Sequence, residues 1–441
     1  MAPAKPQFPQ SPPGRQLAWL LERVGREGND AADGDRERFV PGSRILREAD
    51  GVAGFFRRLA MRLGPARVES ARADSERQAS AWLAADDGKR WRLSCEVEGD
   101  PPHRISGVDW QRELDFDVVV REATEGDGAA LAEIERGCPL VLGDGQMVID
   151  RGSDYFAFAR LMEDVTVSFG LIDGEPAGIN CGALRTARIG GVDRRIMVAI
   201  HTRILPQHQR KGLWGALSRL LGKKYPDVDG SIGYGSVDNL AIQRGFAAVA
   251  EKWDPGPVRL QLDCGTLAGP AVGRAATPED APRIVEILNA CHEGEEMYTP
   301  YTTTTLRERL ERAPAQYSWG HVRLTAGAVV GVWPAGESIC IVAEAQGERV
   351  ESRRGVVLDY GFVPGRTGAE EELAALLRDA CARLCERGMD TLSLFSSPGS
   401  RGYADLSALA REAEAFYAWT PGVPVPDDVA RVGMYTDAIY F

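Results

Sequence analysis

The 441-residue chain has few of the residues that staple a small fold or bind a metal ion. Its eight cysteines include no CxxC pair and only five histidines are present, so the sequence predicts neither a disulfide framework nor a zinc site. No run of eighteen apolar residues occurs, and no apolar stretch follows the basic residue near the N-terminus. We therefore expect a cytoplasmic protein that does not span a membrane.

Dense positive charge is also missing. The net charge is −12 and no Lys/Arg run exceeds a few residues, which disfavours nucleic-acid binding and favours a cationic or amine partner. With 44% hydrophobic and 26% charged residues the composition is globular, and the length predicts two to four domains. The sequence leaves the oligomeric state open, a homo-oligomer included.

An internal repeat organises most of the chain. The segment from Arg121 to Cys138 matches the one from Arg274 to Cys291, at an offset of 153 residues. Each reads as a strand end, a capping box and an amphipathic helix; the box residues are Thr124 with Asp127 and Thr277 with Asp280. At the same offset, Gly174 and Gly178 match Gly327 and Gly331 in a strand, turn and strand pattern.

These landmarks predict four segments: a disordered Pro-rich tail at 1–12, an α+β domain at 13–115, and two copies of one domain at 116–265 and 267–441. The 13–115 segment has amphipathic helices followed by alternating strands, with a hairpin between Trp82 and Trp91. It resembles the small NTF2-like or steroid-isomerase-like domains fused to some actinobacterial enzymes. No catalytic signature accompanies the likeness, so we expect a structural or substrate-shaping role.

The segment from Arg194 to Pro226 carries the chemistry. Alternating residues predict a strand, Pro206 a turn, and the residues from about Gly212 an amphipathic helix. The N–H groups and dipole of a helix N-terminus favour a phosphate, Arg210 and Lys211 add charge, and Gly212 permits a close approach of the backbone.

The run PQHQRKGLWGAL (206–217) resembles the acetyl-coenzyme A motif of Gcn5-related N-acetyltransferases, the GNAT family. Gln209 and Gly212 match the first two fixed positions of that motif, and Trp214 stands where the family has a small residue. The resemblance implies a fold of mixed α+β and α/β class, in which two GNAT domains, each a largely antiparallel mixed sheet flanked by helices, follow the α+β domain. It implies acetyl-CoA or another acyl-CoA as cofactor, held by Ile204, Leu205, Gln209, Arg210, Lys211, Gly212, Leu213, Trp214 and Asn239.

Asn239 enters through a second family element, a strand at Gly230 to Ser236 followed by VDNLAIQRGF. In the family the splayed ends of two parallel strands receive the pantetheine arm, and an Asn-started helix that ends in Gly-Phe touches the cofactor. Gly245 and Phe246 arrive early, and the tyrosine that often protonates the leaving thiolate is missing from this helix.

The resemblance implies direct acyl transfer to an amine, with backbone N–H groups before Pro206 facing the developing oxyanion. His201 is the candidate base, on a strand face shared by period two with Met197, and a water chain is the alternative. Tyr234 is a candidate acid or orienting hydroxyl, with core packing as the other reading. Glu133 and Glu135 on the first helix are expected to be solvated.

The second copy keeps the strand, the turn and the helix. Aligning Pro364 with Pro206 puts Glu370 opposite Gly212, followed by Glu371 and Glu372, and acids at this end of a helix repel a phosphate. We expect a degenerate copy whose aromatic residues pack in a core or line the acceptor pocket; these are Tyr298, Tyr301, Tyr417 and Trp419.

The leading expectation is an acyl-CoA-dependent N-acyltransferase for a small-molecule amine, in the manner of actinobacterial specialised-metabolism enzymes. Two rivals remain: a CoA-binding or scaffold protein without turnover, prompted by Trp214, and a GNAT-like protein that uses another acyl donor or cleaves a thioester.

Overall fold

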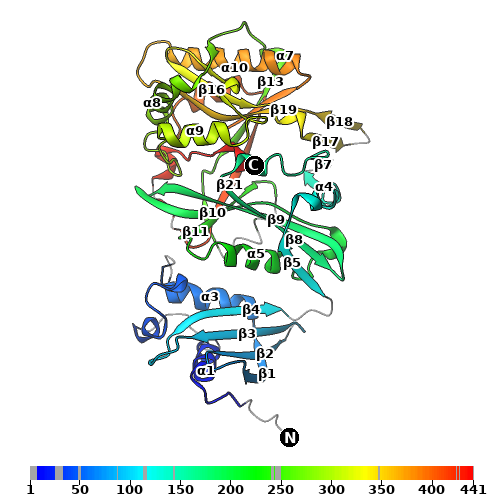
Figure 1. The fold of residues 1–441 in the computed structure, drawn as a ribbon, viewed down its shortest axis with the longest axis vertical. Coiled ribbons are helices and arrows are strands. Elements are labelled where there is room, and N and C mark those ends of the chain that lie inside the picture. Colours follow the sequence, from blue (N-terminus) through cyan, green and yellow to red (C-terminus); the bar gives the residue numbers. More distant parts are fainter. Residues whose placement is uncertain are drawn as a thin grey trace.

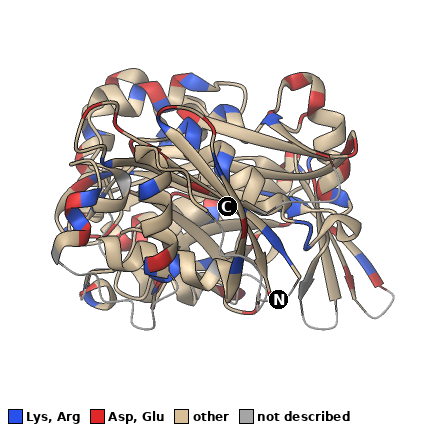
Figure 2. Cartoon of the chain, turned by 90° about the horizontal axis from the view of Figure 1, so that it is seen from below, with Lys and Arg blue, Asp and Glu red and all other residues tan. Residues whose placement is uncertain are grey.

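The computed structural model describes residues 7–24, 33–47, 51–86, 88–112, 117–142, 145–239, 243, 250–345, 348–423, 425–426 and 428–440. An N-terminal part is followed along the longest axis by two copies of one arrangement, and the chain returns at its C-terminal end to lie between the copies (Figure 1). Basic and acidic residues are interspersed over the helices and strands (Figure 2). Within the described ranges, no helix is long and apolar enough to cross a membrane.

The N-terminal part has helices followed by an antiparallel sheet, as predicted. Its helical elements are α1 (Pro12–Val24), η1 (Asp33–Arg38), α2 (Arg44–Arg47) and α3 (Gly51–Leu63). The strands β1 (Ala66–Ala73), β2 (Gln78–Ala85), β3 (Arg90–Val97) and β4 (Ile105–Arg112) form a meander that includes the predicted β2–β3 hairpin. The apolar faces of α1 and α3 close its core, against which Phe8 of the expected tail also packs. Likeness to NTF2-like proteins stays a prediction.

The two halves have the same order of elements, as the internal repeat predicted. The first half consists of β5 (Val118–Glu122), α4 (Gly128–Arg136), β8 (Asp164–Ile172), β9 (Glu175–Ile189), β10 (Val192–Ile204), α5 (Leu213–Lys224) and β11 (Gly230–Ser236). The second half consists of β14 (Arg274–Ala275), α8 (Ala281–Cys291), β15 (Val322–Leu324), β16 (Ala328–Trp333), β19 (Arg354–Phe362), α10 (Ala369–Glu386) and β20 (Thr391–Ser396). In each half the neighbouring strands are antiparallel except the last pair, β10–β11 or β19–β20, which is parallel.

Both predicted capping boxes are present, each around one 3₁₀ turn that leads into the first helix of its half. The turns are η2 (Glu125–Asp127) before α4 and η5 (Pro278–Asp280) before α8. In each box the aspartate accepts from the backbone N–H and the hydroxyl of the threonine and is also bound by an arginine at the preceding strand end. The same local contacts therefore start both halves.

The two halves merge into one 13-stranded mixed sheet because they exchange their last strands. The strand β13 (Val258–Asp263) follows the first half in sequence but pairs with β20 of the second. The strand β21 (Glu412–Thr420) follows the second half but pairs with β11 of the first, and with the short β12 (Glu251–Trp253). At the centre β13 and β21 pair with each other. The chain segments divided near residue 266 therefore do not correspond to two separate sheets.

A second sheet also joins the halves. The hairpin of β6 (Leu140–Leu142) and β7 (Gly145–Asp150) pairs through β7 with β17 (Cys340–Ala345), which forms a hairpin with β18 (Glu348–Ser352). The remaining helical elements are η3 (Ala159–Leu161), η4 (Pro206–His208), α7 (Cys264–Leu267), α9 (Thr303–Arg312), η6 (Trp319–His321), η7 (Ala335–Glu337), α11 (Tyr403–Leu409), α12 (Val429–Val432) and η8 (Ala438–Tyr440).

Helices cover the 13-stranded sheet both on the faces that the two halves turn towards each other and on the outer faces. The central core lies between the halves and joins α4, α8, α9 and the C-terminal segment to the inward-facing strand residues. The outer core lies under α10 of the second half. On the corresponding outer face of the first half, Leu213 of α5 packs so closely that a Cβ at Gly170 or Gly178 would lie 2.7 or 2.9 Å from its methyl groups. Helix α5 faces the N-terminal part (Figure 1), where Arg219 interacts with Asp109 of β4.

Candidate functional site

The parallel strands β10 and β11 separate towards their carboxyl ends. They pair from Ile196 with Gly230 to Ala199 with Gly233, whereas β10 runs on to Ile204 and β11 to Ser236. Beyond Gly233, β11 pairs on its other side with β21. The structure therefore has the splayed pair that the family resemblance implied, and it lies in the first half.

A β-bulge in β10 lies beside this splay. The ladder with β9 is regular to Ile200, passes over His201 and Thr202, and resumes at Arg203. His201 has a φ of 51°, in the left-handed region that non-glycine residues rarely adopt. A bulge turns backbone groups out of the ladder, so the N–H groups of this stretch are placed next to the splay.

The bulge also changes the face on which His201 lies. Period two from Met197 predicted one shared face, but Met197 packs on the α5 side whereas His201 lies edge-on to Phe158 of the central core, with ring centroids 4.6 Å apart. That expectation was wrong because one irregular step in a strand reverses the alternation of side chains.

His201 is held by a buried ion pair. Arg151 donates to Nδ1 of His201 at 3.0 Å, and its Nε donates to Glu135 at 2.6 Å. Burial, followed by the charges of Arg151 and Arg203, holds the pKa of His201 well below its ordinary value, so the imidazole is neutral near pH 7.

The prediction for the two acids of the first helix is half right. Glu133 has a side chain that is 77% exposed, but that of Glu135 is only 1% exposed because it faces inwards to Arg151. A buried carboxylate needs a partner. Here the partner is Arg151, which lies 16 residues further along the chain and which the sequence pattern did not connect to Glu135.

Tyr234 lies on β11 at the other side of the splay. Burial raises the pKa of its hydroxyl above the ordinary value, so the phenol stays protonated at neutral pH. Its charged neighbours are Arg185 of β9 and Asp437 of the C-terminal segment. Tyr234 and His201 thus belong to the two strands that diverge, as the sequence predicted.

The turn that follows β10 leads directly into a helix N-terminus. Gly212 is the N-cap of α5 with φ 80° and ψ 2°, and it has no side chain that could cap the helix. Only glycine adopts this backbone conformation without strain, so the turn itself requires Gly212, whereas its close approach to a phosphate stays a prediction. Because glycine has no side chain, the N-cap residue itself leaves the first N–H groups of α5 and the positive end of its dipole uncovered.

The other residues predicted to hold the cofactor surround this turn. Gln209 is exposed and its amide donates to the carbonyl of Ile204 at 3.3 Å, while Lys211 lies 3.5 Å from Nδ1 of His208. Burial and then Lys211 lower the pKa of His208, which makes it a neutral neighbour. Four further predicted residues are placed by packing or by the helix start: Ile204 and Leu213 at the core under α5, Leu205 at the central core, and Trp214 as the second residue of α5. Arg210 has a φ of 63°.

Asn239 begins a helical turn after β11. Its N–H donates to the carbonyl of Ser236, and its own carbonyl accepts from Gln243 at 3.1 Å. The rest of the predicted helix, including Gly245 and Phe246, lies outside the described residues.

The second half has a shorter turn at the corresponding place. Its helix α10 is capped by Gly368, with φ 81° and ψ 2°, and only six residues separate it from the end of β19, against eight in the first half. Gly368, not Glu370, is therefore the counterpart of Gly212. Aligning the two prolines was wrong because it ignored this two-residue difference in turn length.

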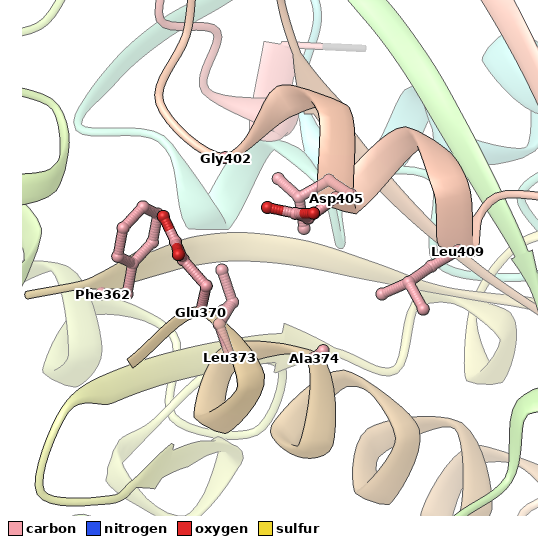
Figure 3. A pocket seen from close by; sticks show the side chains of 8 residues that line it. Phe362, Glu370, Leu373, Ala374, Gly402, Asp405 and Leu409 are labelled. Atoms are coloured by element: carbon pink, nitrogen blue, oxygen red, sulfur yellow. The ribbon is translucent and has the colours of Figure 1, made fainter. Parts of the chain in front are cut away.

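The acids of the second half consequently lie in the first turn of α10, beginning two residues after the glycine cap. Glu372 accepts from the N–H of Gly327 at 2.7 Å and pairs with Arg366 at 3.0 Å, so it closes the turn internally. Glu370 and Asp405 line a pocket between α10 and α11 together with apolar residues such as Phe362 (Figure 3). Counted from the glycine caps, Ala216 of the first half stands where Glu372 stands in the second.

The second splay is bridged by a side chain. The strands β19 and β20 pair only to Val356 with Ser393, and beyond this point Tyr360 donates its hydroxyl to the carbonyl of Phe395 at 3.1 Å. Counted back from the strand ends, Tyr360 corresponds to Thr202, whose hydroxyl instead donates to Asn180 within its own antiparallel pair at 2.8 Å.

A charged network that the sequence did not indicate fills the second half beside this splay. Arg309 of α9 binds Asp359 of β19 at 3.1 Å and Asp437 at 2.7 Å. Two tyrosines also donate to Asp359, Tyr301 at 2.9 Å and Tyr317 at 2.6 Å. Tyr301 and its neighbour Tyr298, which donates to Asn289, are therefore packed in a hydrogen-bonded core. Trp419 is 5% exposed.

Known proteins share this arrangement at low sequence identity. No protein-family model and no curated protein sequence matches the chain. Saccharomyces cerevisiae N-myristoyltransferase with bound myristoyl-CoA superposes with a TM-score of 0.50 and 10% identity, over 75% of this chain and 86% of the other. A tandem GNAT protein from the clavulanic acid biosynthesis pathway gives a TM-score of 0.45 and 12% identity, over 70% of this chain and 100% of its own. The chain thus has the fold of N-myristoyltransferase.

Proposed function

We propose that the first half binds an acyl-coenzyme A and transfers its acyl group to a small amine. The observation that carries this is the junction of three features in one half: the splay of β10 and β11, the bulge at His201, and the glycine-capped start of α5. The fold shared with an acyl-CoA-using N-acyltransferase supports the same conclusion.

The residues of the turn suit a pyrophosphate. The N-terminus of α5 offers N–H groups and a positive dipole end, Gly212 brings the backbone close, and Lys211 adds a cation. Thr367 stands in place of Lys211 in the second half, one residue before the cap, and Glu372 already occupies that turn. The cofactor is therefore assigned to the first half.

The splay suits the pantetheine arm and the reacting carbonyl. Bound acyl-CoA would supply the thioester carbon that the amine attacks. Backbone N–H groups at the bulge of β10 would stabilise the oxyanion, and the side chain of Asn239 would lie beside the arm. The protonated phenol of Tyr234 is suited to give a proton to the leaving thiolate.

His201 is better suited to positioning than to accepting the amine proton. Its Nδ1 accepts from Arg151, and the neighbouring cations oppose a second proton on the ring. A water molecule is then the acceptor of the amine proton, which was the alternative left open by the sequence.

A matched pair of variants tests the cofactor assignment. Lys211→Glu puts a carboxylate before the cap of α5, and Thr367→Glu puts one at the same place before α10. Calorimetry with acetyl-CoA should show a loss of affinity of about tenfold or more, or 1.4 kcal/mol, for Lys211→Glu only. Absence of binding to the wild type, or equal losses in both variants, would remove the assignment.

Turnover separates the remaining readings. Thiol release from acetyl-CoA that depends on an added amine and yields an acylated amine supports the transferase. Binding without thiol release indicates a scaffold, and thiol release without an acylated amine indicates thioester cleavage.

A further inference from the structure

Three polar groups in the interior of the protein lack a partner. The side chain of Arg354, the first residue of β19, is partly buried and makes no hydrogen bond and no ion pair with any residue that the structure describes. The Nε–H of Arg259 on β13 and the hydroxyl of Ser393 on β20 are buried and without a hydrogen bond among the same residues. Ser393 is 1% exposed. Unsatisfied polar groups are costly in an interior, so three together call for an explanation.

The three groups lie on one face of the central sheet. Arg354 is two residues before Val356, and Val356 belongs to the central core, so both side chains point into it. Val356 is paired with Ser393. Two residues further along β20, Phe395 of the same core is paired with Arg259. The register thus places all three unpartnered groups on one face, along a diagonal that crosses β19, β20 and β13, with Ser393 in the middle.

The charge on this face is not balanced. Arg259 pairs with Glu414 of β21, and Arg151 of the first half pairs with Glu135. Arg354 forms no ion pair of its own with the described residues. Burial, followed by the charges of Arg259 and Arg151, lowers the pKa of its guanidinium to about 9, and the charge of Glu414, which Arg259 already binds, offsets this only in part. A cation held in this way is unfavourable on its own, and an anion would relieve it.

The same cluster reaches the proposed site of transfer. Arg151 lies near enough to Arg354 to lower its pKa, and it donates to His201 in the bulge of β10 at 3.0 Å. A molecule whose anionic end met Arg354 would therefore extend towards the splay of the first half.

We propose that Arg354, Arg259 and Ser393 bind the oxyanion group of the acceptor, so that the acceptor is a small amine that also carries a carboxylate or a phosphate. This rests on the proposed function for the identity of the ligand as the acceptor. Guanidinium groups match both oxyanions through paired N–H donors, and the serine hydroxyl adds a third.

Arg354→Met is the decisive variant because it keeps the apolar stem and removes the charge. Arg349→Met is its control, since Arg349 is 60% exposed and pairs with Glu351 on a surface hairpin. Thermal unfolding is followed with acetate, with phosphate and with uncharged acetamide, at constant ionic strength set with sodium chloride.

The wild type and Arg349→Met should show a rise in Tm with acetate or phosphate and none with acetamide. Arg354→Met should lose this rise and should unfold at a higher Tm than the wild type without added anion, because an unpaired cation has been removed. A rise that persists in Arg354→Met, or that is missing in the wild type, overturns the anion site. The anion with the larger shift identifies the oxyanion.

Pairs of amines that differ in one acidic group then test whether the anion site binds the acceptor during acyl transfer. Thiol release from acetyl-CoA is measured with phenylalanine and phenethylamine, and with phosphoethanolamine and ethanolamine. For the acidic member that the wild type uses, Arg354→Met should raise KM at least tenfold while KM for acetyl-CoA and for the uncharged amine is unchanged. Equal use of acidic and uncharged amines by the wild type overturns this proposal and leaves the transferase standing. No thiol release with any amine overturns the proposed function, and the Tm shifts still decide the anion site.

Discussion

The first splay and the second are built from the same strands and differ in what lies across them. In the second half Tyr360 spans from β19 to the Phe395 carbonyl of β20, and Glu372 binds Arg366 and the Gly327 N–H in the turn beyond. In the first half the corresponding hydroxyl of Thr202 stays within its own ladder, and Ala216 replaces the glutamate. Two substitutions and a shorter turn thus separate a half suited to a ligand from a half whose splay and turn are closed by its own side chains.

The largest expected effect comes from a variant that places the glutamate of the second half, Glu372, at the corresponding position of the first half, Ala216. Ala216→Glu places a carboxylate beside the proposed pyrophosphate position, so affinity for acetyl-CoA should fall about 100-fold, or 2.8 kcal/mol. Calorimetry measures the loss, and Ala216→Gln is the control of similar size. If the glutamine variant loses as much affinity as the glutamate variant, bulk and not charge distinguishes the two turns.

The repeat, the capping boxes, the strand from Gly230 to Ser236 and the glycine start of α5 could be predicted because they depend on neighbouring residues. The counterpart of Gly212 could not be predicted, because the length of a turn varies independently of the strand and helix on either side of it. The predictions for His201 and Glu135 were wrong for related reasons. A bulge puts His201 on the other face of its strand, and an ion pair with a distant arginine stabilises the buried carboxylate of Glu135. Arg354 and the exchange of β13 and β21 left no local signal, since long-range pairing alone defines them.

The next effect concerns the bridge across the second splay. Tyr360→Phe removes the buried hydrogen bond to the Phe395 carbonyl and should lower the free energy of unfolding by about 1–2 kcal/mol. Thr202→Val in the first half removes a hydroxyl from an exposed residue and should cost about 0.5 kcal/mol. Urea unfolding compares them. Equal costs would show that the bridge does not distinguish the halves.

Two histidines should make the halves respond to pH in opposite directions. Burial and Arg151 hold the pKa of His201 below its ordinary value, so its neutral form is required and stability falls as the pH drops below about 6.5. Burial also opposes charge on His292, but Glu295 at 3.2 Å outweighs it and raises the pKa. The contribution of His292 is therefore complete below about pH 6.5 and is lost as the pH rises through its folded value.

Unfolding of His201→Asn and His292→Asn from about pH 5 to pH 8 measures this contrast. Relative to the wild type, each variant should remove a slope of at most about 1.4 kcal/mol per pH unit, on the acid side for His201 and on the alkaline side for His292. Slopes of the same sign would contradict the assigned shifts.

The smallest expected difference in stability between the halves concerns the two capping boxes, which have the same contacts. Asp127→Ala and Asp280→Ala remove the same contacts to a threonine and an arginine, so each should cost about 1 kcal/mol and the two costs should match within about 0.5 kcal/mol. Glu308→Ala, at an exposed position of α9, is the control. Chemical denaturation of the three variants checks this, and unequal costs would mean that the caps differ in their surroundings.

The exchange of last strands has a consequence for the order in which the protein is made. Every side chain proposed to hold the cofactor has been synthesised once Asn239 is added to the chain, yet β11 lacks one of its two neighbouring strands until β21, at Glu412–Thr420, has followed. A nascent chain therefore carries an unpaired strand edge for the synthesis of the whole second half. A stop codon shortly before Glu412 would spare all those residues and still leave the first site unsupported.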